Sequence, residues 1–276
     1  MADNFAHCEN LVREADKDRF LAALFAPADR RGALFAVYAF NIEVARVREN
    51  IREAMAGEIR LQWWRDAIET GAGEARAHPV ADALLETIAR FTLPLAPFID
   101  LIEARAFDLY DDPMPTSAAL EGYAVKTSSA LIQIAAAILD PPFAVMPDAI
   151  REGGLAYALT GLLRAFPIHA ARGQLYVPLD VLERHGAHIE DVYAGRDTPQ
   201  LRAALAEMRQ MARTLFENYR RGAGKIQPMQ APAFLPLALV PLTLDRLDRT
   251  AAASFAVVEV PQWRRQWALW RAARRM

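Results

Sequence analysis

Apolar residues recur along most of the chain at the three- and four-residue spacing of amphipathic helices. The segment 201–221 is the most regular example, with Leu201, Leu205, Met208 and Leu215 on one predicted helical face. The chain is also rich in Ala and Leu and contains few residues with a strong preference for strands. These patterns predict an all-α protein.

Prolines and glycines divide this pattern into separate predicted helices. The predicted helical segments are 5–24, 29–54, 58–70, 79–88, 94–107, 117–139, 155–166, 180–185, 201–221, a bent helix over 231–244, and 261–276. Residues 71–78 and 196–199 are predicted connections. We expect Pro167 to end or kink its helix and Asp180 to cap the next one. The sequence shows no internal repeat and no convincing linker, so we expect one domain over residues 1–276.

Composition excludes several classes of protein. A formal net charge of −2 argues against a general nucleic-acid binder, and 53% apolar residues are enough for a large core. Cys8 is the single cysteine, which excludes an internal disulfide and a cysteine metal cluster and fits a reducing compartment. The first twenty residues resemble neither a signal nor a transit peptide. The run closest to the about 18 apolar residues of a membrane span, 231–244, is interrupted by prolines, so we expect a cytoplasmic protein.

Three groups of residues could carry chemistry but have simpler interpretations. Trp63 and Trp64 have the spacing of aromatic residues that pack in a core. Asp108, Asp111 and Asp112 resemble a metal motif, but the proline that follows favours solvated acids at a helix end. The two histidines at 185 and 188 are separated by a glycine and have no third ligand nearby, which favours turn residues over a metal site.

Two stretches resemble the signatures of the squalene/phytoene synthase family. The shared residues are Arg30, Arg31, Ala33, Leu34, Tyr38, Ala39 and Phe40 in the first stretch, and Arg164, Arg172, Gly173, Tyr176, Pro178, Leu179 and Asp180 in the second. The resemblance covers residues 4 to 180 and becomes weaker after them. The resemblance implies a single-domain helical bundle of the isoprenoid (terpenoid) synthase type.

Acidic residues that hold magnesium against the substrate diphosphate in that family are largely absent here. The corresponding positions are Ala45, Arg46, Glu49, Ala165, Ile168 and His169, so one acid remains. Magnesium requires oxygen ligands, and a cation in their place repels it. At about 4 Å and an effective dielectric of about 20, each unit-charge pair contributes about 4 kcal/mol, so reversed charges outweigh any residual affinity. We therefore predict no metal, no cofactor and no catalytic residue.

One branch of the family departs from it in the same way. The segment Leu163-Arg164-Ala165, the pair Pro167 and His169, and the later His185-Gly186 resemble the mitochondrial complex I assembly factor. This resemblance implies a non-catalytic assembly factor or chaperone for NADH:quinone oxidoreductase, with subunits of that complex as partners.

Two alternatives remain open. The protein could bind an isoprenoid or quinone-like lipid without turnover, because arginine matches phosphate in bidentate geometry. The residues predicted for such a pocket or anion site are Tyr38, Asn41, Arg48, Tyr123, Arg164, Arg172 and Tyr176, together with Arg46. The other alternative is a working prenyl-diphosphate transferase, which would require magnesium.

Residues 261–276 form a predicted basic helix with five arginines and no acid. Trp263, Trp267 and Trp270 fall on one face of it. This helix could dock on its own domain, lie at a membrane interface or fit a partner's groove. Contact with a membrane would make the protein peripheral to the inner membrane.

Overall fold

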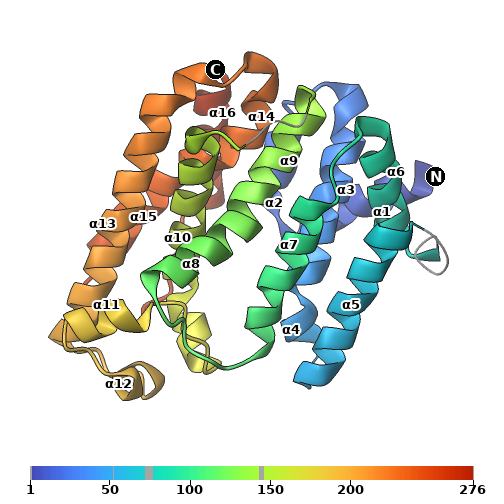
Figure 1. Ribbon diagram of the computed structural model, residues 1–276. Coiled ribbons are helices and arrows are strands. Elements are labelled where there is room, and N and C mark those ends of the chain that lie inside the picture. Colours follow the sequence, from blue (N-terminus) through green and yellow to red (C-terminus); the bar gives the residue numbers. More distant parts are fainter. Residues whose placement is uncertain (1, 52, 72–76, 143–145, 276) are drawn as a thin grey trace.

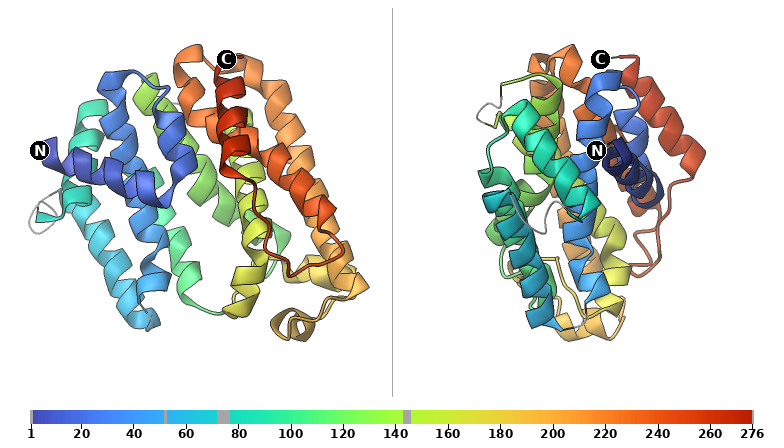
Figure 2. Two further views of the ribbon diagram at one scale, coloured as in Figure 1. Left: turned by 180° about the vertical axis from the view of Figure 1, so that it is seen from behind. Right: turned by 90° about the vertical axis from the view of Figure 1, so that its right-hand side faces the viewer.

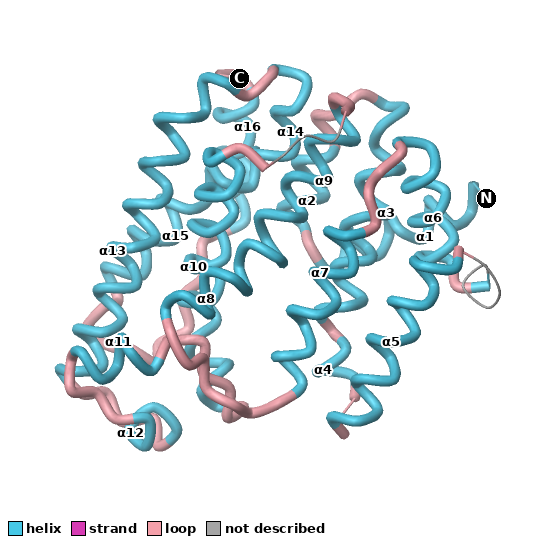
Figure 3. The backbone as a smooth tube through the Cα atoms, viewed as in Figure 1, coloured by secondary structure: helices cyan, strands magenta, loops and turns pink. Residues whose placement is uncertain are grey.

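A computed structural model describes residues 2–51, 53–71, 77–142 and 146–275, and every regular element in these residues is helical (Figures 1 and 3). The α-helices are α1 (Ala2–Ala15), α2 (Lys17–Ala23), α3 (Ala28–Ala45), α4 (Val47–Asn50), α5 (Ala54–Thr70), α6 (Pro79–Phe91), α7 (Ala96–Arg105), α8 (Ser117–Ala124), α9 (Ala130–Leu139), α10 (Asp148–Ala171), α11 (Leu179–Arg184), α12 (Ile189–Tyr193), α13 (Pro199–Gly222), α14 (Ala231–Phe234), α15 (Leu239–Arg249) and α16 (Gln262–Ala273). Short 3₁₀ turns are η2 (Ala106–Leu109), η4 (Ala223–Lys225), η5 (Pro228–Gln230) and η6 (Leu235–Ala238), and η3 (Val125–Ser129) is a π-turn. The prediction of an all-α protein is confirmed.

Two central helices organise the bundle. Helix α3 packs against α1, α6 and α9, whereas α10 packs against α13, α15 and η3. Each is surrounded by its own hydrophobic cluster. Helix α3 is buried over most of its circumference, as expected for a helix that is apolar on nearly all sides. Helices α1, α2 and α16 cover the back of the bundle, where the chain after α15 returns to α16 (Figure 2).

The helical stretch Ser117–Leu139 passes through the core as α8, η3 and α9. By length and composition it is the one candidate membrane span in the described part of the chain, but 78% of the tested window is buried in the bundle. Helix α10 approaches this stretch closely at Gly154, where an added Cβ would collide with the backbone of Ser129. Glycine therefore permits the contact between α10 and η3.

Several predicted boundaries were wrong. The first predicted helix is divided at Asp16, whose side chain caps α2 by accepting a hydrogen bond from the backbone N–H of Arg19 at 3.0 Å. The second ends at Ala45 and resumes as α4, with Arg46 between them. Helix α10 continues through Pro167 to Ala171, so the proline does not end it. Proline removes one backbone N–H donor, and the helix tolerates this loss because the neighbouring residues keep their N–H groups.

Two other expectations concern the later connections. Asp180 lies inside the first turn of α11 rather than capping it, and its carboxylate accepts from the backbone N–H and hydroxyl of Ser117, at 3.0 and 3.1 Å. It therefore supports the start of α8. The predicted bent helix over 231–244 is interrupted by the turn η6. Of the predicted connection 71–78, residues 72–76 lie outside the described residues.

Candidate functional site

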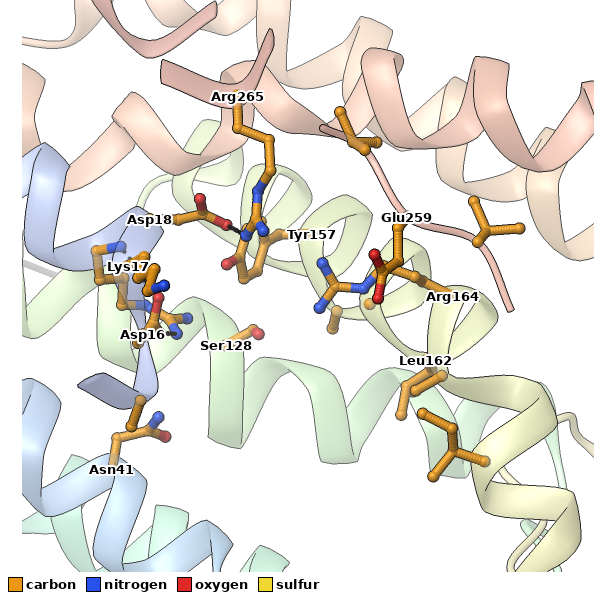
Figure 4. A pocket seen from close by; sticks show the side chains of 18 of the residues that line it. Asp16, Lys17, Asp18, Asn41, Ser128, Tyr157, Leu162, Arg164, Glu259 and Arg265 are labelled. Atoms are coloured by element: carbon orange, nitrogen blue, oxygen red, sulfur yellow. Dashed lines mark hydrogen bonds and ion pairs between the residues drawn. The ribbon is translucent and has the colours of Figure 1, made fainter. Parts of the chain in front are cut away.

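A cavity of about 750 Å³ is lined by residues from both central helices, α3 and α10, and from their neighbours. Its walls come from the junction of α1 and α2, from α3, α7, α8 and η3, from one face of α10, and from residues 257–265 (Figure 4). Small side chains on α10, such as Ala158 and Ala165, leave the space open, and a Cβ on Gly161 would meet no atom within 4 Å. The volume is that of a typical small-molecule site.

Acids at the α1–α2 junction are held by arginines. Asp16 lies 2.6 Å from the guanidinium of Arg19, which also lies over the rings of Tyr157 and Tyr38, with its Cζ 5.1 and 5.8 Å from their centroids. Burial raises the pKa of both tyrosines, although the arginine opposes this shift. On this side of the cavity a compensated ion pair therefore lies against two neutral phenols, of which that of Tyr157 lines the cavity.

Asp18 is a buried carboxylate on the same wall, with 5% of its surface exposed. It pairs with Arg265 of α16, and its other oxygen, Oδ1, has no hydrogen-bond partner among the described residues (Figure 4). Burial raises the pKa of Asp18, and the hydrogen bond from Arg265 opposes the rise. This ion pair joins α16 to α2 beside the cavity.

A second buried carboxylate, that of Asp108, lies below Arg105 and Tyr123, which form the floor of the cavity, and it is 6% exposed. It accepts hydrogen bonds from the hydroxyls of Tyr176 and Tyr123, at 2.7 and 3.0 Å, and from Arg105 at 2.9 Å. Burial, and then the charge of Asp108, raise the pKa of Tyr176. The interpretation of this acid as solvated is wrong, because η2 turns it into the core.

The two other acids of that group behave as predicted. Asp111 and Asp112 follow η2 and are exposed, and Asp111 pairs with Arg48 at 2.8 Å. Trp64 is fully buried and contacts Phe40 edge-on, with 5.2 Å between ring centroids, which confirms its assignment to the core.

The positions that correspond to the family's metal ligands are only partly gathered in the structure. Ala165 and Ile168 line the cavity, whereas Ala45 is half-buried outside it and Arg46 is exposed. Glu49 pairs with Arg172 at 3.0 Å, which links the end of the first signature to the turn within the second. The surviving acid is therefore neutralised by a cation of the chain itself.

His169 cannot replace an acidic ligand in this arrangement. Its ring lies against Tyr176, with 4.7 Å between centroids, and burial lowers the pKa of the imidazole. The described residues contain no group of three His, Cys, Asp or Glu side chains that could hold a metal ion. A magnesium cluster of the kind that the family resemblance implies does not fit these residues.

The predicted pocket residues separate into two sets. Asn41, Tyr123 and Arg164 line the cavity. The others are outside its lining: Tyr38 lies beside Arg19, Arg48 beside Asp111, Arg172 beside Glu49 and Tyr176 beside Asp108.

Sequence reasoning missed much of the cavity wall. The unpredicted lining residues with polar side chains include Asp16, Asp18, Arg19, Arg105, Tyr157 and Arg265. The sequence contains one signal for this wall. Residues 14–19 are nearly all charged, so a single amphipathic helix cannot continue through them with an apolar face.

Helix α16 docks on the bundle through the face opposite its tryptophans. Leu269 is buried with Ala22, Leu235 and Leu239. The three tryptophans remain outside, with exposed fractions of 64% for Trp263, 54% for Trp267 and 40% for Trp270. The face predicted from the spacing therefore forms, but it points to solvent.

Comparison with known proteins gives a consistent result. The squalene/phytoene synthase family model matches residues 12–271. "NADH dehydrogenase (ubiquinone) complex I, assembly factor 6" of Rattus norvegicus is 28% identical over 248 residues, which are 90% of this chain and 74% of that protein. The human protein of the same name is 29% identical over 245 residues, or 88% and 73% of the two chains.

Enzymes of the family are also similar to the chain. "Phytoene synthase, chloroplastic" of Narcissus pseudonarcissus is 25% identical over 262 residues, covering 90% of this chain and 60% of that protein. The crystal structure of a dehydrosqualene synthase superposes with a TM-score of 0.82 at 20% identity and covers 99% of this chain and 96% of that one. That structural likeness confirms the predicted isoprenoid synthase fold.

Proposed function

The chain belongs to the squalene/phytoene synthase family, and we propose that it is a non-catalytic member that assists the assembly of NADH:quinone oxidoreductase, complex I. The observation that carries the proposal is the salt bridge between Glu49 and Arg172. Glu49 stands at the one motif position that keeps an acid, and here that acid pairs with an arginine of the chain.

The electrostatics support the absence of catalysis. Ionisation of a prenyl diphosphate requires cations that stabilise the leaving pyrophosphate, which magnesium supplies through carboxylate ligands. Here Ala45, Ala165 and Ile168 offer no ligand oxygen from their side chains, and Arg46 places a positive charge instead. Recruiting a metal would require breaking the salt bridge of Glu49 and would still provide one carboxylate.

The similarity to the assembly factors supports the role in assembly. These relatives match 83 to 90% of this chain, and the rat and human proteins are 28 and 29% identical. We infer from this that subunits of complex I, or their membrane-associated intermediates, are the partners.

Deletion of the gene in its source organism tests the assembly role. We expect membranes of the deletion strain to lose NADH:quinone oxidoreductase activity, with succinate dehydrogenase activity as the control, and wild-type protein to restore it. Normal amounts of assembled complex I in the deletion strain would overturn the proposal.

One substitution separates assembly from catalysis. Glu49→Gln removes the remaining acid at the motif positions, so a metal-dependent synthase would lose activity while an assembly factor keeps its function. We expect the variant to restore complex I in the deletion strain. We also expect purified wild-type protein to release no pyrophosphate from farnesyl or geranylgeranyl diphosphate with magnesium, and release would refute the non-catalytic assignment.

The cavity favours a second function, the binding of an isoprenoid or quinone-like lipid without turnover. Apolar residues of α10 form one side of its lining, and charged side chains of both signs form the rest, among them Arg164, which points toward Glu259 (Figure 4). Gly161→Leu would fill this space, because an added Cβ meets no neighbour, and Gly122→Leu on α8 is a matched control outside the cavity. We expect native mass spectrometry to find a lipid on the wild type and on the control but not on Gly161→Leu. Protein without lipid in all three would exclude this function.

A further inference from the structure

We propose that the outward face of α16 binds the surface of an anionic phospholipid bilayer. Three tryptophans that are 40 to 64% exposed follow one line along this helix. From Trp263 to Trp270 the helix rises about 10 Å, so all three rings can reach a flat surface together. This inference is independent of the assembly role, because either can fail without the other.

The fold does not need these tryptophans for packing. Helix α16 is held by its other face, where Leu269 is buried, and by the ion pair of Arg265 with Asp18. The exposed rings of Trp267 and Trp270 stack on each other with 4.9 Å between centroids. A preformed aromatic surface on a fixed helix is thus available to a partner.

Charge complementarity identifies the partner as anionic. Residues 262–275 contain five arginines and no acid, in a chain whose net charge is −2. Arg265 is used internally, whereas Arg264, Arg271, Arg274 and Arg275 are exposed. Two of them lie over tryptophan rings. The Cζ atom of Arg264 is 5.1 Å from the ring centroid of Trp263, and that of Arg274 is 4.7 Å from the ring centroid of Trp270.

Arginine and tryptophan together are suited to the interface of a bilayer. Tryptophan places an apolar ring and a polar N–H at the level of the headgroups, and arginine pairs with lipid phosphates while its stem stays apolar. Each basic residue near an anionic membrane surface strengthens binding about fivefold. A groove in a protein partner would have to offer anionic groups along the whole face, whereas a bilayer provides them everywhere.

Vesicle flotation tests the proposal with the full-length protein. We expect binding to vesicles of phosphatidylglycerol and phosphatidylcholine in equal parts, little binding to phosphatidylcholine alone, and weaker binding at high salt. Brominated lipids should quench tryptophan fluorescence. Two of the five tryptophans, Trp63 and Trp64, lie at least partly within the bundle, so this quenching reports on α16.

Two variants and a matched control assign the surface. We expect Arg264→Gln/Arg271→Gln/Arg274→Gln to weaken vesicle binding on the order of 100-fold. Trp263→Ser/Trp267→Ser should weaken it at least about tenfold and abolish most of the quenching. The control Arg90→Gln/Arg220→Gln/Arg221→Gln removes the same charge from other exposed positions and should bind as the wild type does. Circular dichroism should show that all three variants keep the fold.

Several outcomes would overturn the proposal. Wild-type protein that does not float with anionic vesicles would refute it directly. Equal loss of binding in the control would show that net charge alone acts. A dimer in sedimentation velocity that is lost in Trp263→Ser/Trp267→Ser, without any lipid binding, would assign the face to a second copy of the chain.

Discussion

Replacement of Asp108 by asparagine tests whether the buried acid holds the two sides of the cavity floor together. The carboxylate accepts hydrogen bonds from Arg105 on one side and from Tyr123 and Tyr176 on the other. Asparagine has nearly the same size, but its amide nitrogen is a donor and its charge is zero. The guanidinium of Arg105, with 19% of its side-chain surface exposed, would lose its ionic partner.

The expected cost follows from this burial. Removal of one partner from a buried ion pair costs about 3–5 kcal/mol, because the other charge stays buried without compensation. For a chain of this size, each kcal/mol lowers the melting temperature by about 2–4 °C, so we expect Asp108→Asn to lower it by about 6–20 °C. Tyr176→Phe removes one hydrogen bond to a charged group, which contributes about 1.5–3 kcal/mol, and should produce a smaller decrease.

Differential scanning calorimetry measures this, and the same acidic segment provides its control. Asp111 is three residues away and pairs with Arg48, but 61% of its side chain is exposed. Exposed ion pairs contribute at most about 1 kcal/mol, so Asp111→Asn should lower the melting temperature by less than about 4 °C. Equal melting temperatures for Asp108→Asn and Asp111→Asn would refute the assignment of Asp108 to a structural network.

Three further predictions concern packing, pH dependence and thiol reactivity. Gly154→Ala should lower the free energy of unfolding in urea by at least about 1–3 kcal/mol, because its Cβ would meet the backbone of η3. Gly122→Ala should raise it by about 0.5–1 kcal/mol, because its Cβ would meet no atom. The opposite order would contradict the close packing of α10 on η3. Burial raises the pKa of Asp18, so its contribution to stability is complete below the unfolded pKa of about 3.9 and declines as pH rises through the folded pKa. Asp18→Asn should therefore gain stability relative to the wild type as the pH rises above about 4, and a pH-independent difference would argue against it. Burial raises the pKa of the Cys8 thiol to about 12, so iodoacetamide should modify the native protein at pH 8 far more slowly than the urea-unfolded chain, and equal rates would contradict this burial.

The helical architecture could be predicted because local apolar spacing and buried faces agree. The long amphipathic helix α13 and the proline that begins α6 both appear where the pattern places them. Helix boundaries inside continuous helical patterns were harder to predict. The cap at Asp16 follows the local preference of aspartate for helix starts, whereas the passage of α10 through Pro167 depends on tertiary packing that overrides the local preference of proline.

The candidate site shows a similar division. The residue types at the motif positions predict that no metal is bound, because chemistry that needs an oxygen ligand cannot use alanine or arginine. The environment of Asp108 could not be predicted, because a sequence does not tell which face of a 3₁₀ turn contacts two distant tyrosines. The pairing of Asp18 with Arg265 joins residues 247 positions apart, beyond the reach of any local pattern.

Ion pairs neutralise acids in the cavity wall and at the end of the first signature, which is consistent with the proposed function. Asp16 and Asp18 each bind an arginine, and Glu49 binds Arg172. Facing acidic helices would need divalent cations to offset their repulsion, but these acids are already neutralised by the chain. A magnesium ion entering here would have to replace an arginine whose donors already bind the acid. Under the proposed function these pairs would hold the walls of the cavity in place without a metal, and the cavity would serve binding rather than synthase chemistry.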